Sequence, residues 1–206
     1  MTVTRGRLFV IAAPSGAGKT SLVRALIQRE PELRFSISYT TRKPRPNEKP
    51  EHDYFFVDEE EFKRMIAAGA FLEHACVFDN RYGTSRSQVE GLLEQGANVL
   101  LEIDWQGAQQ VRKTMPECES IFILPPSRTA LEARLRGRAT DTAEVIARRL
   151  RDSIADMSHW NEFKYVVIND EFERAVEDLV LILKGRGEHL AAQRSEVQQL
   201  VGQLLQ

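Results

Sequence analysis

The chain has 206 residues, of which 42% are hydrophobic and 28% charged, which is ordinary for a folded globular protein and argues against disorder. A formal net charge of -2 argues against a strongly basic nucleic-acid-binding protein, and two cysteines, Cys76 and Cys118, are too few for a disulfide framework or zinc site. No apolar stretch approaches the length of a membrane span, so the composition predicts a cytoplasmic protein that binds neither nucleic acid nor a membrane.

The first predicted elements are a buried strand and a helix, joined by a glycine-rich loop. Residues 8–13 are continuously apolar, as in a strand buried on both faces, and residues 19–30 carry apolar side chains at helical spacing. The loop between them, PSGAGKT, matches a phosphate-binding loop except that Ala13 stands at the first glycine of the usual pattern. Because position 13 should end the strand with a negative φ, we expect an alanine to be tolerated there.

A loop of this kind binds phosphate with its backbone. Successive N–H groups converge on phosphate oxygens at the helix N-terminus, Lys19 adds a charge on the β- and γ-phosphates, and the Thr20 hydroxyl binds Mg²⁺ with phosphates and waters. The alternative is a tight turn that matches the pattern by chance, which the flanking strand and helix disfavour. The predicted ATP-binding residues of the loop are Ala13, Pro14, Ser15, Gly16, Ala17, Gly18, Lys19, Thr20 and Ser21.

Later segments extend the same alternation of strands and helices. Residues 98–103, 120–124 and 165–168 read as buried strands, and the first of them precedes a predicted helix at 107–113. This alternation predicts an α/β fold, with a parallel sheet core flanked by helices. The tail at 187–206 has apolar residues at near-heptad spacing over too short a length for a coiled coil, which favours a terminal packing helix.

Residues 36–84 interrupt that alternation with a polar, turn-rich stretch around a predicted helix at 58–68, which indicates an inserted lobe. Arg42 and Arg45 are suited to phosphate, which guanidinium groups bind through paired N–H donors. Further along, Glu73 stands in the apolar, strand-like segment FLEHACVF. A basic surface loop and an edge charge or salt-bridge partner at Glu73 are the structural alternatives.

Six arginines lie between positions 134 and 151. Arg134 and Arg138 are four residues apart beside a glycine, which favours a moving lid that excludes water over a solvated basic face or a nucleic-acid patch. Asp141 and Glu144 are spaced as at the start of a helix, so a second helix is predicted to begin there.

Taken in order, the segments APSGAGKT, SYTTRKPRP, DYFFV, FLEHA, RYGTS, LLEIDWQGAQQ and RLRGRATDT resemble guanylate kinases of the bacterial type over roughly residues 7–184. The resemblance implies a P-loop nucleoside-monophosphate kinase fold that transfers the γ-phosphoryl group of ATP to GMP, with Mg²⁺. It also implies one domain with a core (7–35, 85–133 and 150–186), a GMP-binding lobe (36–84), a helical lid (134–149) and a C-terminal helix (187–206).

The resemblance also assigns roles to single residues. Its GMP site corresponds to Ser38, Arg42, Arg45, Tyr54, Glu73, Tyr82, Thr84, Glu102 and Asp104. The chemistry of these residues agrees with guanine, because a Glu73 carboxylate suits the N1–H and N2–H₂ donors and a hydroxyl of Ser38 or Thr84 suits O6. Asn169 corresponds to the adenine side of the ATP site, and the implied catalytic residues are Lys19, Arg45, Arg134, Arg138 and Arg149. The sequence departs from the family pattern at Ala13 and at residues 79–81, where a glycine and a tyrosine are commoner.

Two other functions compete with this interpretation. Related domains in scaffold proteins have lost catalysis and bind protein partners, but such domains typically lose phosphate-loop or lid residues that this chain retains. A different P-loop phosphotransferase is disfavoured because Ser38, Glu73 and Tyr82 fit guanine better than adenine or uracil. The sequence leaves open dGMP as an acceptor and a homo-oligomeric state.

Overall fold

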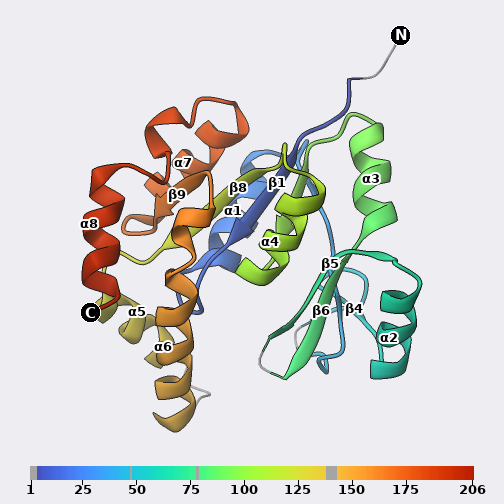
Figure 1. Ribbon diagram of the computed structural model, residues 1–206, viewed down its shortest axis with the longest axis horizontal. Coiled ribbons are helices and arrows are strands. Elements are labelled where there is room, and N and C mark those ends of the chain that lie inside the picture. The colour runs from blue at the N-terminus through green and yellow to red at the C-terminus, as the bar shows by residue number, and fades with distance from the viewer. Residues whose placement is uncertain (1–3, 47, 78, 138–142) are drawn as a thin grey trace. The chain divides into compact units, whose positions relative to one another are not determined.

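The structure is a computed structural model of the chain, and it describes residues 4–46, 48–77, 79–137 and 143–206. The chain forms two compact units. The first unit comprises Met1–Val10 and Pro31–Cys118, and the second comprises Ile11–Glu30 and Glu119–Gln206. Figure 1 shows the α/β character that the sequence predicts, with strands alternating with helices.

A five-stranded sheet has the order β2-β7-β1-β8-β9. Its strands are β1 (Leu8–Ala12), β2 (Arg34–Phe35), β7 (Val99–Glu102), β8 (Glu119–Leu124) and β9 (Tyr165–Ile168). β2 pairs in parallel with β7, and β8 pairs in parallel with β9. All of β1 and most of β7, β8 and β9 are buried, which is why these segments are continuously apolar in the sequence. The four predicted strands are thus confirmed.

The first unit also contains a four-stranded sheet with the order β4-β3-β6-β5. Its strands are β3 (Tyr39–Thr40), β4 (Phe55–Phe56), β5 (Phe71–Val77) and β6 (Asn80–Ser85), the last two of which form the antiparallel hairpin in Figure 1. α2 (Glu59–Ala67) confirms the helix predicted at 58–68, and Asp58 caps it through a hydrogen bond from the Glu61 N–H at 2.7 Å. The division into lobe, core and lid remains a prediction.

The first unit has two further helices, one after a strand of the four-stranded sheet and one after a strand of the five-stranded sheet. α3 (Arg86–Glu94) follows β6, and α4 (Trp105–Thr114) follows β7. The Oδ1 atom of Asp104 accepts a hydrogen bond from the Gly107 N–H at 2.8 Å and so caps α4. This cap explains why α4 begins two residues before the helix predicted at 107–113.

The second unit is mainly helical around β8 and β9. Its helices are α1 (Lys19–Arg29), α5 (Arg128–Arg136), α6 (Ala143–Met157), α7 (Phe172–Leu183), α8 (Ser195–Leu204) and the 3₁₀ turns η1 (Trp160–Glu162) and η2 (Glu188–Leu190). The helix start predicted at Asp141 lies outside the described residues. In α8, Val197, Val201 and Leu204 are buried, which confirms a terminal packing helix, but this helix begins at Ser195 and not at the predicted residue 187. Within the described ranges, we find no helix with the length and apolar character needed to cross a bilayer.

Candidate active site

The phosphate loop lies between β1 and α1 in the second unit, and its glycines have the conformation that the pattern requires. Gly16 and Gly18 have φ values of 89° and 94°, in the left-handed region that side chains rarely adopt. Among the described non-glycine residues, only Glu51 and Asp79 have positive φ, so Ala13 has the negative φ predicted for it. The departure from the pattern at position 13 therefore leaves the backbone of the loop undisturbed.

Donors from later parts of the second unit hold the carbonyl oxygens of the loop. The side-chain amide of Asn169 donates to the Ala17 carbonyl at 2.7 Å, and the Ser153 hydroxyl donates to the Ser15 carbonyl at 3.0 Å. Arg134 donates to the carbonyls of Asn169 and Ala17 at 2.8 and 3.4 Å. These contacts fix the shape of the loop without a nucleotide, because they join its backbone to buried or half-buried side chains.

The start of α1 suits an anion. The first turn of α1 contains no acidic residue, and the helix macrodipole places partial positive charge at this end. Lys19, Thr20 and Ser21, all predicted to contact ATP, begin this helix. Of the remaining predicted catalytic residues in this unit, Arg149 is half-buried in α6, and Arg138 lies outside the described residues.

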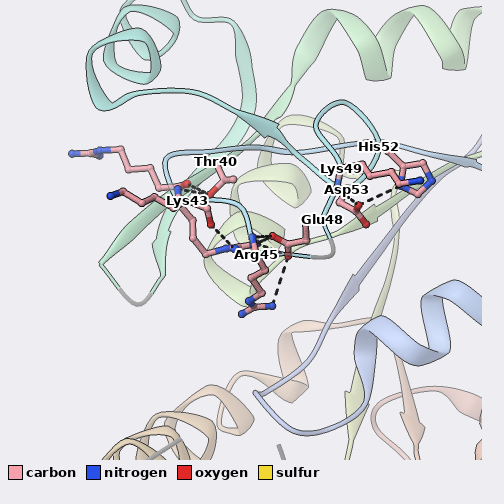
Figure 2. Close-up of polar contacts among 9 residues, drawn as sticks. Thr40, Lys43, Arg45, Glu48, Lys49, His52 and Asp53 are labelled. Atoms are coloured by element: carbon pink, nitrogen blue, oxygen red, sulfur yellow. Dashed lines mark hydrogen bonds and ion pairs between the residues drawn. The ribbon is translucent and has the colours of Figure 1, made fainter. Parts of the chain in front are cut away.

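Arg42 and Arg45 form a second basic group, in the first unit, together with a carboxylate that the sequence analysis did not single out. Figure 2 shows Glu48 next to Arg45. The Nη2 atom of Arg42 donates to both Glu48 oxygens at 2.8 and 3.0 Å, and the Arg45 backbone N–H donates to Glu48 at 2.8 Å. The Arg45 side chain is 66% exposed, and its Nη1 atom lies 3.8 Å from Glu48. Glu48 thus orders the loop that presents both arginines.

Glu48 is ionised in this environment. Burial alone would raise its pKa, but the hydrogen bonds from the Arg42 guanidinium and the Arg45 backbone outweigh it and lower the pKa. The sequence offered one signal, an acidic residue three positions after Arg45 in an otherwise basic stretch. Spacing could not show that the carboxylate also reaches Arg42.

Two tyrosines adjoin Arg42 in the same unit. The Arg42 guanidinium carbon lies 5.3 Å from the centre of the Tyr54 ring, and the rings of Tyr54 and Tyr82 are 6.0 Å apart, edge to face. Burial, with smaller contributions from Glu102 and Tyr82, raises the pKa of Tyr54 to about 12. Its hydroxyl therefore stays protonated at neutral pH and can donate a hydrogen bond to an anion. We call Arg42, Arg45, Tyr54 and Tyr82 the arginine–tyrosine cluster.

Glu73 and Thr84 form a buried polar pair on the hairpin of β5 and β6. The two residues face each other in the strand register, and the Thr84 hydroxyl donates to Glu73 Oε1 at 2.6 Å. Their exposed fractions are 2% and 1%, which does not fit the alternative of a solvent-exposed edge charge at Glu73. A hydroxyl has one hydrogen to donate, so this bond favours Ser38 over Thr84 as the donor to guanine O6.

This fold and these residues define a P-loop kinase. The family model described as guanylate kinase matches residues 5–186. The chain belongs to the guanylate kinase family.

Relatives and a solved structure agree with this assignment over nearly the whole chain. A guanylate kinase of Chromohalobacter salexigens is 51% identical over 98% of this chain and 94% of its own length. The Escherichia coli guanylate kinase is 48% identical over 98% of this chain and 99% of its own length. The crystal structure of guanylate kinase from Anaplasma phagocytophilum superposes with a TM-score of 0.73 at 32% identity, covering 96% of this chain and 94% of that one.

Proposed function

We propose that the protein transfers the γ-phosphoryl group of ATP to GMP and releases ADP and GDP. The observation that carries the acceptor assignment is the buried Glu73 carboxylate, which Thr84 holds in the same unit as the arginine–tyrosine cluster. A carboxylate can accept hydrogen bonds from both N1–H and N2–H₂ of guanine. Adenine would instead present the N1 lone pair to the carboxylate. Its binding would then be weaker, because a buried charged group would be left without a hydrogen-bond partner.

On the ATP side, the phosphate loop binds the triphosphate and Lys19 neutralises its developing charge. Thr20 would hold Mg²⁺, because its hydroxyl oxygen is a hard ligand of the kind that this ion prefers. When bound, the ion would supply neutralisation of phosphate charge. Arg134 and Asn169 keep the loop in its binding shape, and the family resemblance assigns Arg138 and Arg149 to the phosphates of ATP.

On the GMP side, the arginine–tyrosine cluster binds the α-phosphate, while Glu73 and Ser38 bind the base. Glu102 and Asp104 lie at and just after the end of β7, where the family has carboxylates. The attacking phosphate oxygen is already anionic, so the reaction needs positioning and charge neutralisation rather than a strong general base. This agrees with a site that is rich in arginine and has no assigned histidine.

The test is a coupled assay of ADP release with a panel of acceptors. We expect turnover with GMP and kcat/KM for AMP and UMP lower by roughly 10⁴, as for sites built around paired polar groups. Including dGMP in the panel decides whether it is also an acceptor. A preference for AMP or UMP would contradict the proposal. A folded protein that binds GMP without ADP release would favour a non-catalytic binding module.

A further inference from the structure

Gly107, in the first turn of α4, lies directly against the Glu73 carboxylate. A Cβ atom placed on Gly107 would be 2.3 Å from Glu73 Oε2 and 3.0 Å from Glu73 Cδ. It would also be 3.2 Å from Asp104 Oδ1, which caps the same helix. Real Cβ atoms essentially never approach a heavy atom this closely, so any larger residue at position 107 must displace the carboxylate.

The backbone gives no other reason for a glycine here. Gly107 is helical and does not have the positive φ found at Gly16 and Gly18. In a helix, glycine is less favourable than alanine by about 0.8–1.0 kcal/mol. A glycine that lowers helix stability at a position without conformational need indicates a requirement for space, and the atom that occupies the space is Glu73 Oε2.

Two features define the surroundings of the Glu73 carboxylate. Thr84 donates to Oε1 at 2.6 Å, and Oε2 lies in the space that a side chain at position 107 would fill. The carboxylate is buried, so it has little room to move elsewhere. Since the displaced atom would be the end of a side chain rather than backbone, a methyl group at position 107 should move the carboxylate while the helix still forms.

We propose that Gly107 is a positioning residue for guanine recognition, because the absence of its side chain leaves the space that lets the Glu73 carboxylate lie where the two guanine donors can meet it. The inference rests on the proposed function and extends it to a residue that does not touch the nucleotide. Displacing the acceptor should weaken GMP binding, whereas the ATP site, built in the other unit, should be unaffected.

The experiment compares Gly107→Ala with Gly91→Ala. Gly91 is also helical, in α3 of the same unit, and a Cβ there meets no atom within 4 Å. We expect Gly107→Ala to raise the KM for GMP by roughly 10- to 100-fold, the effect of one or two impaired hydrogen bonds to a charged group, with a smaller change in kcat. The KM for ATP should stay within about twofold of wild type, and Gly91→Ala should leave both KM values unchanged.

A double-mutant cycle with Glu73→Ala separates the positioning role from a general effect on α4. With the Glu73 side chain removed, Gly107→Ala should change the KM for GMP by less than about twofold. An equal loss in both backgrounds would overturn the proposal, as would GMP kinetics of Gly107→Ala that match Gly91→Ala. Should Gly107→Ala alone fold poorly, recovery of its unfolding temperature on adding Glu73→Ala supports the contact, and no recovery contradicts it. A wild-type protein without preference for GMP would instead overturn the proposed function.

Discussion

We propose that two regions of this molecule bind phosphate, and they differ in the groups that would do so. In the second unit the phosphate loop offers backbone N–H groups, with Gly16 and Gly18 at positive φ and no acidic residue in the first turn of α1. In the first unit the arginine–tyrosine cluster offers side chains, and one of them, Arg42, is paired with Glu48 in the structure. One site depends on main-chain shape and the other on side-chain orientation.

A second helix shows why the start of α1 suits an anion. α2 begins with an Asp58 cap and three acidic residues in its first turn, so its own carboxylates satisfy its N-terminus. α1 follows Gly18, which has no side chain that could cap it. A helix N-terminus is thus available to a phosphate only where no acidic side chain occupies its first turn or caps it. The comparison predicts that substitutions in the loop and in the cluster should affect different substrates.

The largest effect should follow Lys19→Met. This substitution removes the positive charge that we expect to neutralise the transferred phosphate but keeps the length of the side chain. We expect kcat to fall by at least roughly 10²–10³, the cost of losing one stabilising group at a developing charge. GMP binding, measured by calorimetry, should be unchanged because the arginine–tyrosine cluster is intact. A loss of GMP affinity similar to the loss of kcat would contradict the separation of the two sites.

Asn169→Ala should have the next largest effect, because it removes the buried donor to the Ala17 carbonyl. The Ala17 carbonyl then keeps only the longer hydrogen bond from Arg134 at 3.4 Å, and the loss of one intramolecular hydrogen bond costs about 0.5–1.5 kcal/mol. We expect a lower unfolding temperature and a KM for ATP raised by roughly tenfold, with the KM for GMP unchanged. The control is Asn98→Ala, which removes an exposed hydrogen bond from the Arg7 N–H in the first unit and should leave the KM for ATP unchanged. Equal ATP kinetics in the two variants would exclude Asn169 as a support of the loop.

The sequence predicts those parts of the molecule whose signal is local. Buried parallel strands such as β8 are continuous apolar runs, and the phosphate loop is a short pattern of glycines, Lys19 and Thr20. The two-residue strands β2 and β3 carry no periodicity and could not be predicted. The contact between Asn169 and Ala17 joins residues 152 positions apart, so no spacing rule could find it.

The same reason applies to the supporting residues of the candidate site. Gly107 meets Glu73 only because α4 packs beside β5, a contact that tertiary structure alone creates. Ser153 reaches Ser15 across 138 positions in the same way. The residues predicted to touch nucleotides remain predictions, whereas the residues that hold them in place had to be seen in the structure.

A smaller effect is expected for Glu48→Gln, which tests the arginine–tyrosine cluster. The variant keeps the shape of the side chain but loses its charge and one acceptor for Arg42 and Arg45. We expect the KM for GMP to rise by about threefold to tenfold, as for loss of one partly exposed hydrogen bond to a charged group, and the KM for ATP to stay unchanged. A GMP affinity that rises instead would indicate that Glu48 competes with phosphate.

The pH dependence of stability offers a second measurement on Glu48. Its pKa in the folded protein lies below the ordinary value of 4.5, so its contribution to folding is fully present above that value and is lost as pH falls through the folded pKa. The unfolding temperature of wild type should therefore exceed that of Glu48→Gln at pH 7, and the difference should shrink below about pH 4. A difference that is the same at both pH values would mean that the charge of Glu48 is not involved.

The smallest effect should follow Ala13→Gly, which restores the usual phosphate-loop pattern. Ala13 already has a negative φ, so a glycine adds no conformation that the loop needs, and its greater freedom in the unfolded chain lowers stability slightly. We expect kcat and both KM values within about twofold of wild type and an unfolding free energy lower by about 0.4–1 kcal/mol, measured by urea unfolding. The matched variant is Gly18→Ala, where φ is 94° and a Cβ would lie 2.4 Å from the Asn169 amide nitrogen, so ATP turnover should fall sharply. A change in activity of more than tenfold in Ala13→Gly, equivalent to about 1.4 kcal/mol, would show that position 13 needs glycine for a reason other than backbone shape.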